Sequence, residues 1–234
     1  MARHRQPRAD EARVIFDVPG GQLRLAPRDL ELWAEHLVWC YRLMGVQDGA
    51  TIAVQDFGSS PLSFLGSALL MPGLSRGVAE RLGGRFVCLD AATERVTLTP
   101  AVLAQLGDTV VVVRAEVAGL LHEVSRKAAP GLGGAGPRTI VSFNDDEPVA
   151  FGTPPWRYML HVEASMLIAP ECPACGFFHL RGGLYSLRAN RVRNLRLACA
   201  EPHELQATMV MPQGQCQAGP NDWCIRYPVR GAGA

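Results

Sequence analysis

The sequence between residues 171 and 179 concentrates side chains that can bind a metal ion. Cys172 and Cys175 form a Cys-x-x-Cys pair, and His179 follows four residues after the second cysteine. Thiolate and imidazole are the ligands that tetrahedral zinc prefers. We expect Cys216 to complete a closed, structural zinc site. Further candidates for the fourth ligand are Cys224, Cys199 and His203, and the alternative to a metal site is a set of reduced thiols in the core.

Acidic side chains and a histidine indicate a second candidate site. Glu163 and His161 are two residues apart at the end of a predicted strand, so both side chains would lie on one face. There they could bind a cation, polarise a ligand or supply a catalytic base, or Glu163 could make only a structural hydrogen bond. Asp146 and Glu147 follow Asp145 after another predicted strand, where open α/β sheets bind ligands. This acidic turn could bind a divalent cation or could simply be solvated.

A basic run lies further along the chain, at Arg188, Arg191, Arg193 and Arg196. It could contact phosphate on a cofactor, a carrier protein or a nucleic acid. Arg191 and Arg193 alternate as residues of a strand do, so they would share one face. No aromatic residues interleave with the arginines, which argues against binding of single-stranded nucleic acid. The alternative is a solvated sheet edge whose charges prevent aggregation.

The composition limits the class of protein. The chain has 234 residues, of which 48% are hydrophobic, and a formal net charge of +1. This length allows one large domain, or one domain with a small appendage. The net charge argues against a broad nucleic-acid surface but not against a local basic patch, and no apolar stretch is long enough for a membrane span. Seven cysteines, an odd number, and a basic start without an apolar signal region favour a reduced, cytoplasmic protein.

The order of apolar patterns predicts an α/β fold with a mostly parallel sheet flanked by helices. Residues 1–12 are expected to be a disordered basic tail, residues 13–164 an α/β domain, and residues 165–230 a small antiparallel β-region that carries the metal site. The strands are expected at 13–25 (as a short strand or a hairpin), 51–54, 85–89, 109–113, 138–143, 158–162, 177–180, 184–187, 195–199, 205–211 and 223–227. The helices are expected at about 27–44, 62–71, 77–82, 99–106 and 116–128.

Several short motifs occur in an order that resembles the phenylacetate–CoA ligase branch of the adenylate-forming enzymes. They are residues 28–34, 45–50, 56–58, 144–148, 158–163, 171–172, 176–179, 204–205 and 225–227. The resemblance implies a substrate pocket near Phe57, Gly58 and Tyr158, a nucleotide-facing turn at Asp146 and Glu147, and a magnesium-associated carboxylate at Glu163. Some members of this family also bind zinc at the positions that match the Glu-Cys and Gly-Leu-His motifs.

The departures from the family pattern bear on activity. The family's phosphate loop is rich in Ser, Thr and Gly, whereas residues 16–22 hold two glycines, an aspartate and no hydroxyl. Lys127 is the only lysine and does not match the family's adenylating lysine. We therefore expect no ATP as a cofactor and no adenylation by this chain alone.

Three functions remain open on the sequence. The first is a degenerate ligase-like protein of a biosynthetic pathway, which binds an aryl or acyl carboxylate, an acyl thioester or a partner protein. The second is an enzyme with a repurposed pocket, which transfers acyl groups or hydrolyses thioesters with Glu163 or His161. The third is a purely structural or interaction module. A homodimer that covers the altered phosphate loop would explain how that loop could be lost. Neither a membrane nor a nucleic acid is an expected partner.

Overall fold

The computed structural model describes most of the chain. The described residues are 14–18, 21–56, 60–66, 76–106, 109–128, 138–145, 156–197, 200, 202–210, 216, 219, 221–227. The expected tail at 1–12 lies outside them, as do Phe57, Gly58, Asp146, Glu147 and Cys199. In the described part of the chain, no helix is long and apolar enough to cross a membrane.

The N-terminal segment forms the expected hairpin and helix. Strands β1 (Val14–Val18) and β2 (Gly21–Leu25) pair in an antiparallel register, and helix α1 (Pro27–Leu43) follows. Proline fits the first helical turn because its missing N–H would be unpaired there anyway. Trp33, Leu37 and Tyr41 recur at helical spacing and are almost completely buried. This apolar stripe attaches α1 to the rest of the core.

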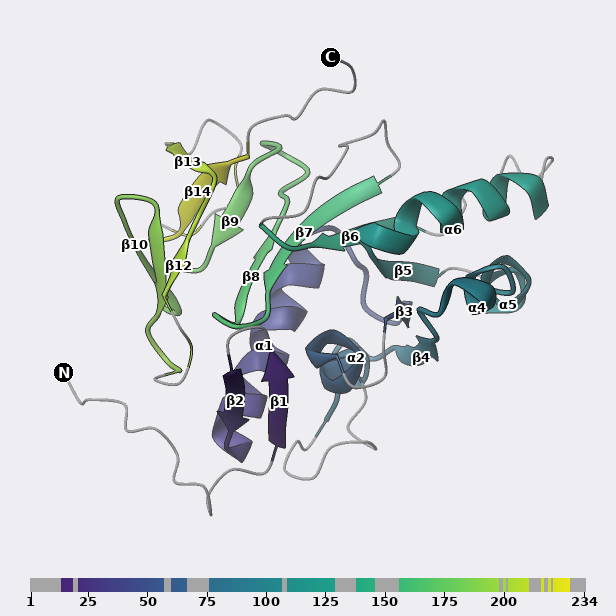
Figure 1. Cartoon of the computed structure of the whole chain (residues 1–234), viewed down its shortest axis with the longest axis horizontal. Coiled ribbons are helices and arrows are strands. Elements are labelled where there is room, and N and C mark those ends of the chain that lie inside the picture. Colours follow the sequence, from purple (N-terminus) through teal and green to yellow (C-terminus); the bar gives the residue numbers. More distant parts are fainter. Residues whose placement is uncertain are drawn as a thin grey trace.

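A six-stranded sheet forms the centre of the molecule (Figure 1). Its strand order is β4-β3-β5-β6-β7-β8, and all neighbouring pairs are parallel except β7 and β8. The strands are β3 (Thr51–Gln55), β4 (Arg85–Leu89), β5 (Thr109–Arg114), β6 (Arg138–Phe143), β7 (Trp156–Val162) and β8 (Leu167–Pro170). Strand β8 had no counterpart among the expected strands. It carries the sheet past residue 164, the expected end of the α/β unit.

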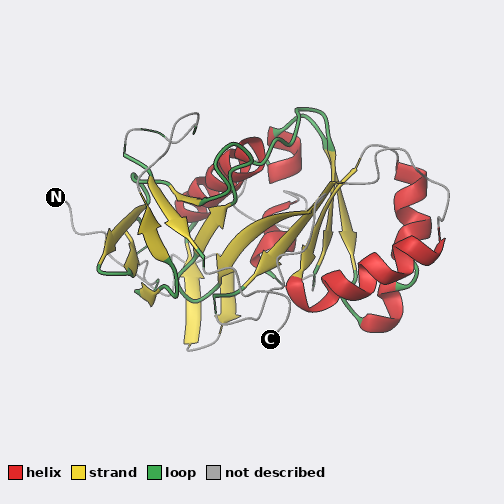
Figure 2. Cartoon of the chain, turned by 90° about the horizontal axis from the view of Figure 1, so that it is seen from above, coloured by secondary structure: helices red, strands yellow, loops and turns green. Residues whose placement is uncertain are grey.

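Helices lie on both sides of this sheet (Figure 2). Helix α1 packs against α2 (Pro61–Gly66) and α3 (Val78–Arg81), whereas α6 (Ala115–Ala128) packs against α4 (Thr93–Val96) and α5 (Thr99–Leu106). The continuous Val110–Val113 run of β5 is buried under both layers, as expected for a central parallel strand. The expected α/β class with a mostly parallel sheet is therefore confirmed.

The C-terminal part folds into two small antiparallel sheets. One has the order β10-β11-β12 and the other β13-β14-β9. Their strands are β9 (Phe178–Leu180), β10 (Tyr185–Arg188), β11 (Arg191–Asn194), β12 (His203–Glu204), β13 (Thr208–Val210) and β14 (Trp223–Arg226).

The strand expected at 195–199 was wrong for residues 195–197. Asn194 ends β11 instead, because its side-chain Oδ1 accepts the backbone N–H groups of Arg196 and Leu197, each at 3.0 Å. Asparagine turns the chain in this way by replacing a backbone acceptor with its own side chain. Strand β11 therefore ends before residue 195, where the expected strand was to begin.

Candidate functional site

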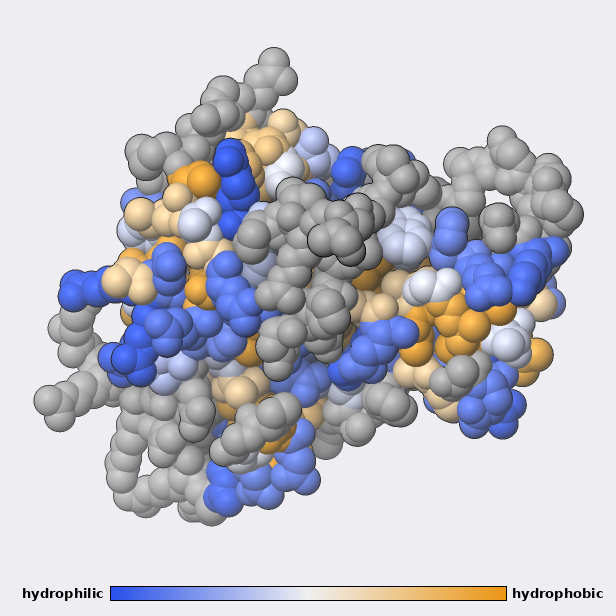
Figure 3. All heavy atoms as spheres, turned by 45° about the horizontal axis from the view of Figure 1, so that its top comes forward, coloured by the Kyte–Doolittle hydropathy of each residue, from blue (hydrophilic) through white to orange (hydrophobic). Residues whose placement is uncertain are grey.

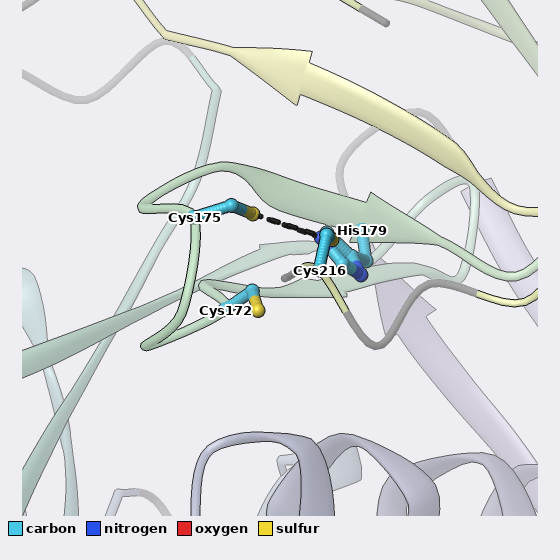
Figure 4. A group of neighbouring side chains, drawn as sticks. All are labelled: Cys172, Cys175, His179 and Cys216. Carbon is cyan, nitrogen blue, oxygen red and sulfur yellow. Dashed lines mark hydrogen bonds between the residues drawn. The ribbon is translucent and has the colours of Figure 1, made fainter. Parts of the chain in front are cut away.

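Four potential metal ligands converge in the C-terminal β-region. The group Cys172, Cys175, His179 and Cys216, called the Cys/His cluster below, has its ligand atoms within 4.8 Å of one another. His179 Nε2 lies 3.0 Å from the Cys216 sulfur and 3.3 Å from the Cys175 sulfur, and the two sulfurs are 3.5 Å apart. Figure 4 shows the side chains of Cys175, His179 and Cys216 meeting, with Cys172 on the other limb of its loop. The sequence expectation named these same four residues.

The spacing of these atoms suits a tetrahedral ion. Metal–ligand distances of about 2.3 Å for sulfur and about 2.0–2.1 Å for nitrogen place tetrahedral ligand atoms roughly 3.5–3.8 Å apart. The separations among Cys175, His179 and Cys216 are 3.0–3.5 Å, close to this range, and the Cys172 sulfur lies within 4.8 Å of the other three ligand atoms. The cluster could thus hold a metal ion with three sulfurs and one nitrogen, and all four positions would be filled by protein.

A tight loop brings the first three ligands together. The Cys172 N–H donates to the Phe177 carbonyl at 2.9 Å, and the Gly176 N–H donates to the Cys172 carbonyl at 2.8 Å. Gly176 adopts φ +70°, a left-handed conformation that glycine reaches without steric cost. The loop therefore turns back within five residues, and β9 then carries His179 past the two thiols.

A second set of hydrogen bonds holds the segment that carries Cys216. The Asp222 carboxylate accepts the Gly219 N–H at 2.8 Å and the Gly182 N–H at 3.0 Å. A Cβ atom on Gly182 would come within 1.7 Å of the Asn221 carbonyl oxygen, so only glycine permits this approach. Asp222 thus fixes the loop near Cys216 against the turn that follows β9.

The electrostatics of the cluster favour neutral side chains unless a cation is bound. Burial raises the pKa of the Cys175 thiol to about 12, and the neighbouring thiols of Cys216 and Cys172 act in the same direction. Burial lowers the pKa of His179, only partly opposed by the charge of Asp222. Neutral imidazole is the form that binds metals, and a bound cation would stabilise the thiolates that burial disfavours.

A second feature is a cleft at the carboxyl edge of the large sheet. It encloses about 130 Å³ and is lined by residues that follow or end β3, β5, β6 and β7: Asp56, Arg114, Ser142, Phe143, Asn144, His161, Val162, Glu163 and Ala164. From β3 the chain continues to β4 on one side, and from β5 it continues to β6 on the other. Open α/β sheets bind ligands where the strand order reverses in this way.

Charged and polar side chains surround this cleft. Arg114 lies 3.6 Å from an Asp56 oxygen and 3.1 Å from a Glu116 oxygen. Desolvation acts to lower the pKa of Arg114, but the carboxylates of Asp56, Glu116 and Glu163 outweigh it and raise the pKa. The guanidinium is therefore a fixed positive charge among carboxylates at the sheet edge.

His161 is the unusual residue of the cleft. Its side chain is only 6% exposed, and among the described residues its Nε2 atom has no hydrogen-bond partner. Burial, together with the charge of Arg114, lowers the pKa of His161 to about 4. The imidazole is hence neutral near pH 7, and its buried Nε2 atom is an unused hydrogen-bonding group among the described residues.

The remaining expected site residues have different places. Glu163 and His161 both line the cleft. Tyr158 is buried with its ring against Phe143 and is not among the residues that line the cleft. Arg114 was not singled out from the sequence, although its position directly after a predicted central strand was a usable signal.

Asp145 belongs to a structural network rather than to an open acidic cluster. Its carboxylate accepts hydrogen bonds from the Tyr227 hydroxyl, from His203 Nε2 at 2.8 Å and from the Gln206 N–H at 3.0 Å. Burial acts to raise the pKa of Asp145, but the bonds from His203 and Tyr227 prevail and lower it. His203 is therefore engaged with Asp145 and does not belong to the Cys/His cluster. Asp145 connects the end of β6 to the C-terminal β-region.

Comparison with known proteins identifies no relative, since no protein-family model and no curated protein matches the chain.

Proposed function

We propose that the chain is a zinc-stabilised, ligase-like protein that binds a small aryl or acyl carboxylate, or the acyl part of a thioester, in the sheet-edge cleft. The observation that carries this proposal is the cleft at the strand-order reversal, which both Arg114 and His161 line, with the Nε2 atom of His161 lacking a hydrogen-bond partner among the described residues. The guanidinium supplies charge-assisted hydrogen bonds to a carboxylate. The neutral imidazole of His161 supplies one more donor or acceptor.

The size of the cleft supports a small ligand. Sites for drug-sized molecules enclose roughly 300–1,000 Å³, whereas this cleft encloses about 130 Å³. One acyl or aryl group matches this volume better than a nucleotide does. The sequence also argues against a nucleotide ligand, because the segment in the place of the phosphate loop has no hydroxyl residue. We therefore propose that the protein does not use ATP.

Ligand binding is tested by calorimetric titration with benzoate and phenylacetate. We expect binding to the wild type and at least a tenfold weaker association with Arg114→Gln. Arg85→Gln, which changes an exposed arginine of β4, is the matched control and should bind as the wild type does. Equal binding by Arg114→Gln would contradict the proposal, as would robust ATP–pyrophosphate exchange in the presence of either acid.

Zinc is the ion that the Cys/His cluster suits best, because three thiolates and an imidazole in a closed tetrahedron form a structural zinc site. Elemental analysis of untagged protein should find about one zinc per chain. Cys172→Ser should lose the zinc and much of the stability that it provides, which is on the order of 10 kcal/mol in small zinc domains. Cys88→Ser, at an exposed thiol of β4, should keep both. Absence of metal from the wild type would refute this part.

A second candidate function is hydrolysis or transfer of an acyl group. It is favoured by His161 and Glu163, which line one cleft and could act on water or on a second nucleophile. Hydrolysis of phenylacetyl thioesters that is lost in Glu163→Gln would support it. An interaction module with no ligand in the cleft is the third possibility and predicts no binding of either acid.

A further inference from the structure

The hairpin of β10 and β11 carries a concentration of positive charge. Between Glu171 and Glu201 the sequence contains five arginines and no acidic residue, in a chain whose formal net charge is only +1. The five are Arg181, Arg188, Arg191, Arg193 and Arg196. All but Arg181 are exposed. On the face in Figure 3, strongly hydrophilic residues lie at the left, the side on which Figure 1 labels β10, as well as at the right and the bottom.

The register of the hairpin places like charges together. Val192 and Asn194 are buried, so Arg191 and Arg193 point outward on the opposite face of β11. Arg188 on β10 is directly opposite Arg191. Like charges in such cross-strand pairs destabilise a hairpin. Glu204 on β12 lies opposite Arg191 on its other side and offsets part of this repulsion, so the cost in stability falls on the Arg188–Arg191 pair.

Protection of a sheet edge explains only some of these arginines. Charged residues that prevent aggregation belong on edge strands, and Arg188 stands on β10, an edge strand of its sheet. β11 lies between β10 and β12, but β12 pairs only with Arg191 and Val192. Arg191 therefore stands where the ladder is paired on both sides, and edge protection does not account for it.

A hollow next to the hairpin brings further arginines to the same area. It encloses about 350 Å³ between α1 and the start of β10, and its lining residues are Arg28, Asp29, Leu32, Glu35, Arg181, Gly183, Leu184 and Arg196. Of its two acidic residues, Asp29 is buried, accepts the Ala26 N–H at 2.9 Å and lies 3.8 Å from Arg28, whereas Glu35 is exposed. Arg196 donates from Nε to the Gly183 carbonyl at 3.1 Å, which holds its guanidinium at the rim.

Apolar side chains accompany the charges. Leu195, between Arg193 and Arg196 in sequence, is 47% exposed, and Leu32 and Leu184 form part of the wall of the hollow. We infer that the β10–β11 hairpin and this hollow form a docking surface for an acidic segment of another protein. Carboxylates of the segment would pair with the arginines, and an apolar residue of the segment would contact Leu195 or enter the hollow.

An acidic protein segment fits this surface better than a nucleic acid. Proteins that bind single strands stack bases on exposed aromatic rings. The large exposed apolar residues in the described part of the chain are Ile15, Leu98, Val102, Leu195 and Met209, none of which is aromatic. An apolar anchor surrounded by arginines instead matches a peptide in which leucine and glutamate alternate with polar residues.

The test uses fluorescence anisotropy with a labelled 16-residue peptide rich in glutamate and containing two leucines. The comparison probes are the same peptide with glutamine in place of glutamate, and a 16-nucleotide single-stranded RNA. We expect the glutamate peptide to bind the wild type and to bind more weakly as salt is raised, because exposed charge pairs are screened. The glutamine peptide should bind at least tenfold more weakly.

Variants identify the surface that binds. The double substitution Arg191→Glu and Arg193→Glu changes two outward side chains and should weaken peptide binding at least tenfold, while circular dichroism confirms the fold. Arg191→Gln with Arg193→Gln gives a milder change in case the first variant does not fold. Arg85→Glu, on β4, should bind as the wild type does. No binding of the glutamate peptide, equal loss in the Arg85 control, or tighter binding of the RNA would each overturn the inference.

Discussion

Replacing His161 with asparagine should remove part of the protein's sensitivity to acid. In the native state burial and the charge of Arg114 lower the pKa of His161 to about 4, from a value of 6.5 in an unstructured chain. The unfolded chain therefore binds a proton at a higher pH than the native protein does. Stability from this group is complete above about pH 6.5 and is lost as the pH falls toward 4. At about 1.36 kcal/mol per pKa unit, the loss is about 2.5 kcal/mol between pH 7.5 and pH 4.5.

The assay is urea unfolding of wild type and His161→Asn at intervals across that pH range. The free energy of unfolding should fall less steeply for the variant, and the two proteins should differ by about 2.5 kcal/mol more at pH 7.5 than at pH 4.5. Effects of acid on other groups, including the Cys/His cluster, are common to both proteins and cancel in this comparison. His122→Asn, at an exposed position on α6, serves as the control. A difference between wild type and His161→Asn that is constant with pH would refute the reasoning.

Two further predictions concern the backbone of the C-terminal region. Gly182→Ala should destabilise the protein by about 1–3 kcal/mol in urea unfolding, because its Cβ would overlap the Asn221 carbonyl. The control is Gly183→Ala, where a Cβ meets nothing within 4 Å, and it should change the free energy of unfolding by less than about 0.5 kcal/mol. Similar effects of the two substitutions would contradict this account. Ala189→Gly should raise the free energy of unfolding by about 0.5–1 kcal/mol. Ala189 adopts φ +45° in the hairpin turn, a left-handed conformation that is strained for alanine and that glycine adopts without strain. A lower urea midpoint for the variant would show that the turn is not strained.

Local patterns in the sequence predicted the elements that depend on local physics. The apolar stripe of α1, the valine run of β5 and the antiparallel pairing of β1 with β2 each have a short-range cause, and all formed as expected. β8 is different. Its four residues, Leu167–Pro170, show no alternation and end in proline, and their strand conformation results from pairing with β7.

The residues of the candidate sites also differ in whether neighbouring or distant parts of the sequence bring them together. Cys172, Cys175 and His179 are neighbours in sequence, so their spacing alone predicted a common loop. Choosing Cys216 as a partner required a guess about a distant segment, which the structure places beside them. The role of Arg114 at the cleft depends on β3 and β5 being adjacent although β4 lies between them in sequence, and no local pattern encodes that order.

The distribution of the Cys/His cluster along the chain has a consequence for the order of events during protein synthesis. Three of its ligands lie within eight residues and would leave the ribosome together, whereas Cys216 follows 37 residues after His179. At about 5–20 residues per second, the fourth ligand emerges roughly 2–7 s later. During that interval a nascent chain could hold an ion with three protein ligands and one exchangeable position. An ion could therefore bind before β13 and β14 fold. Coordination by Cys216 would then be completed only when these strands have joined the sheet that contains β9.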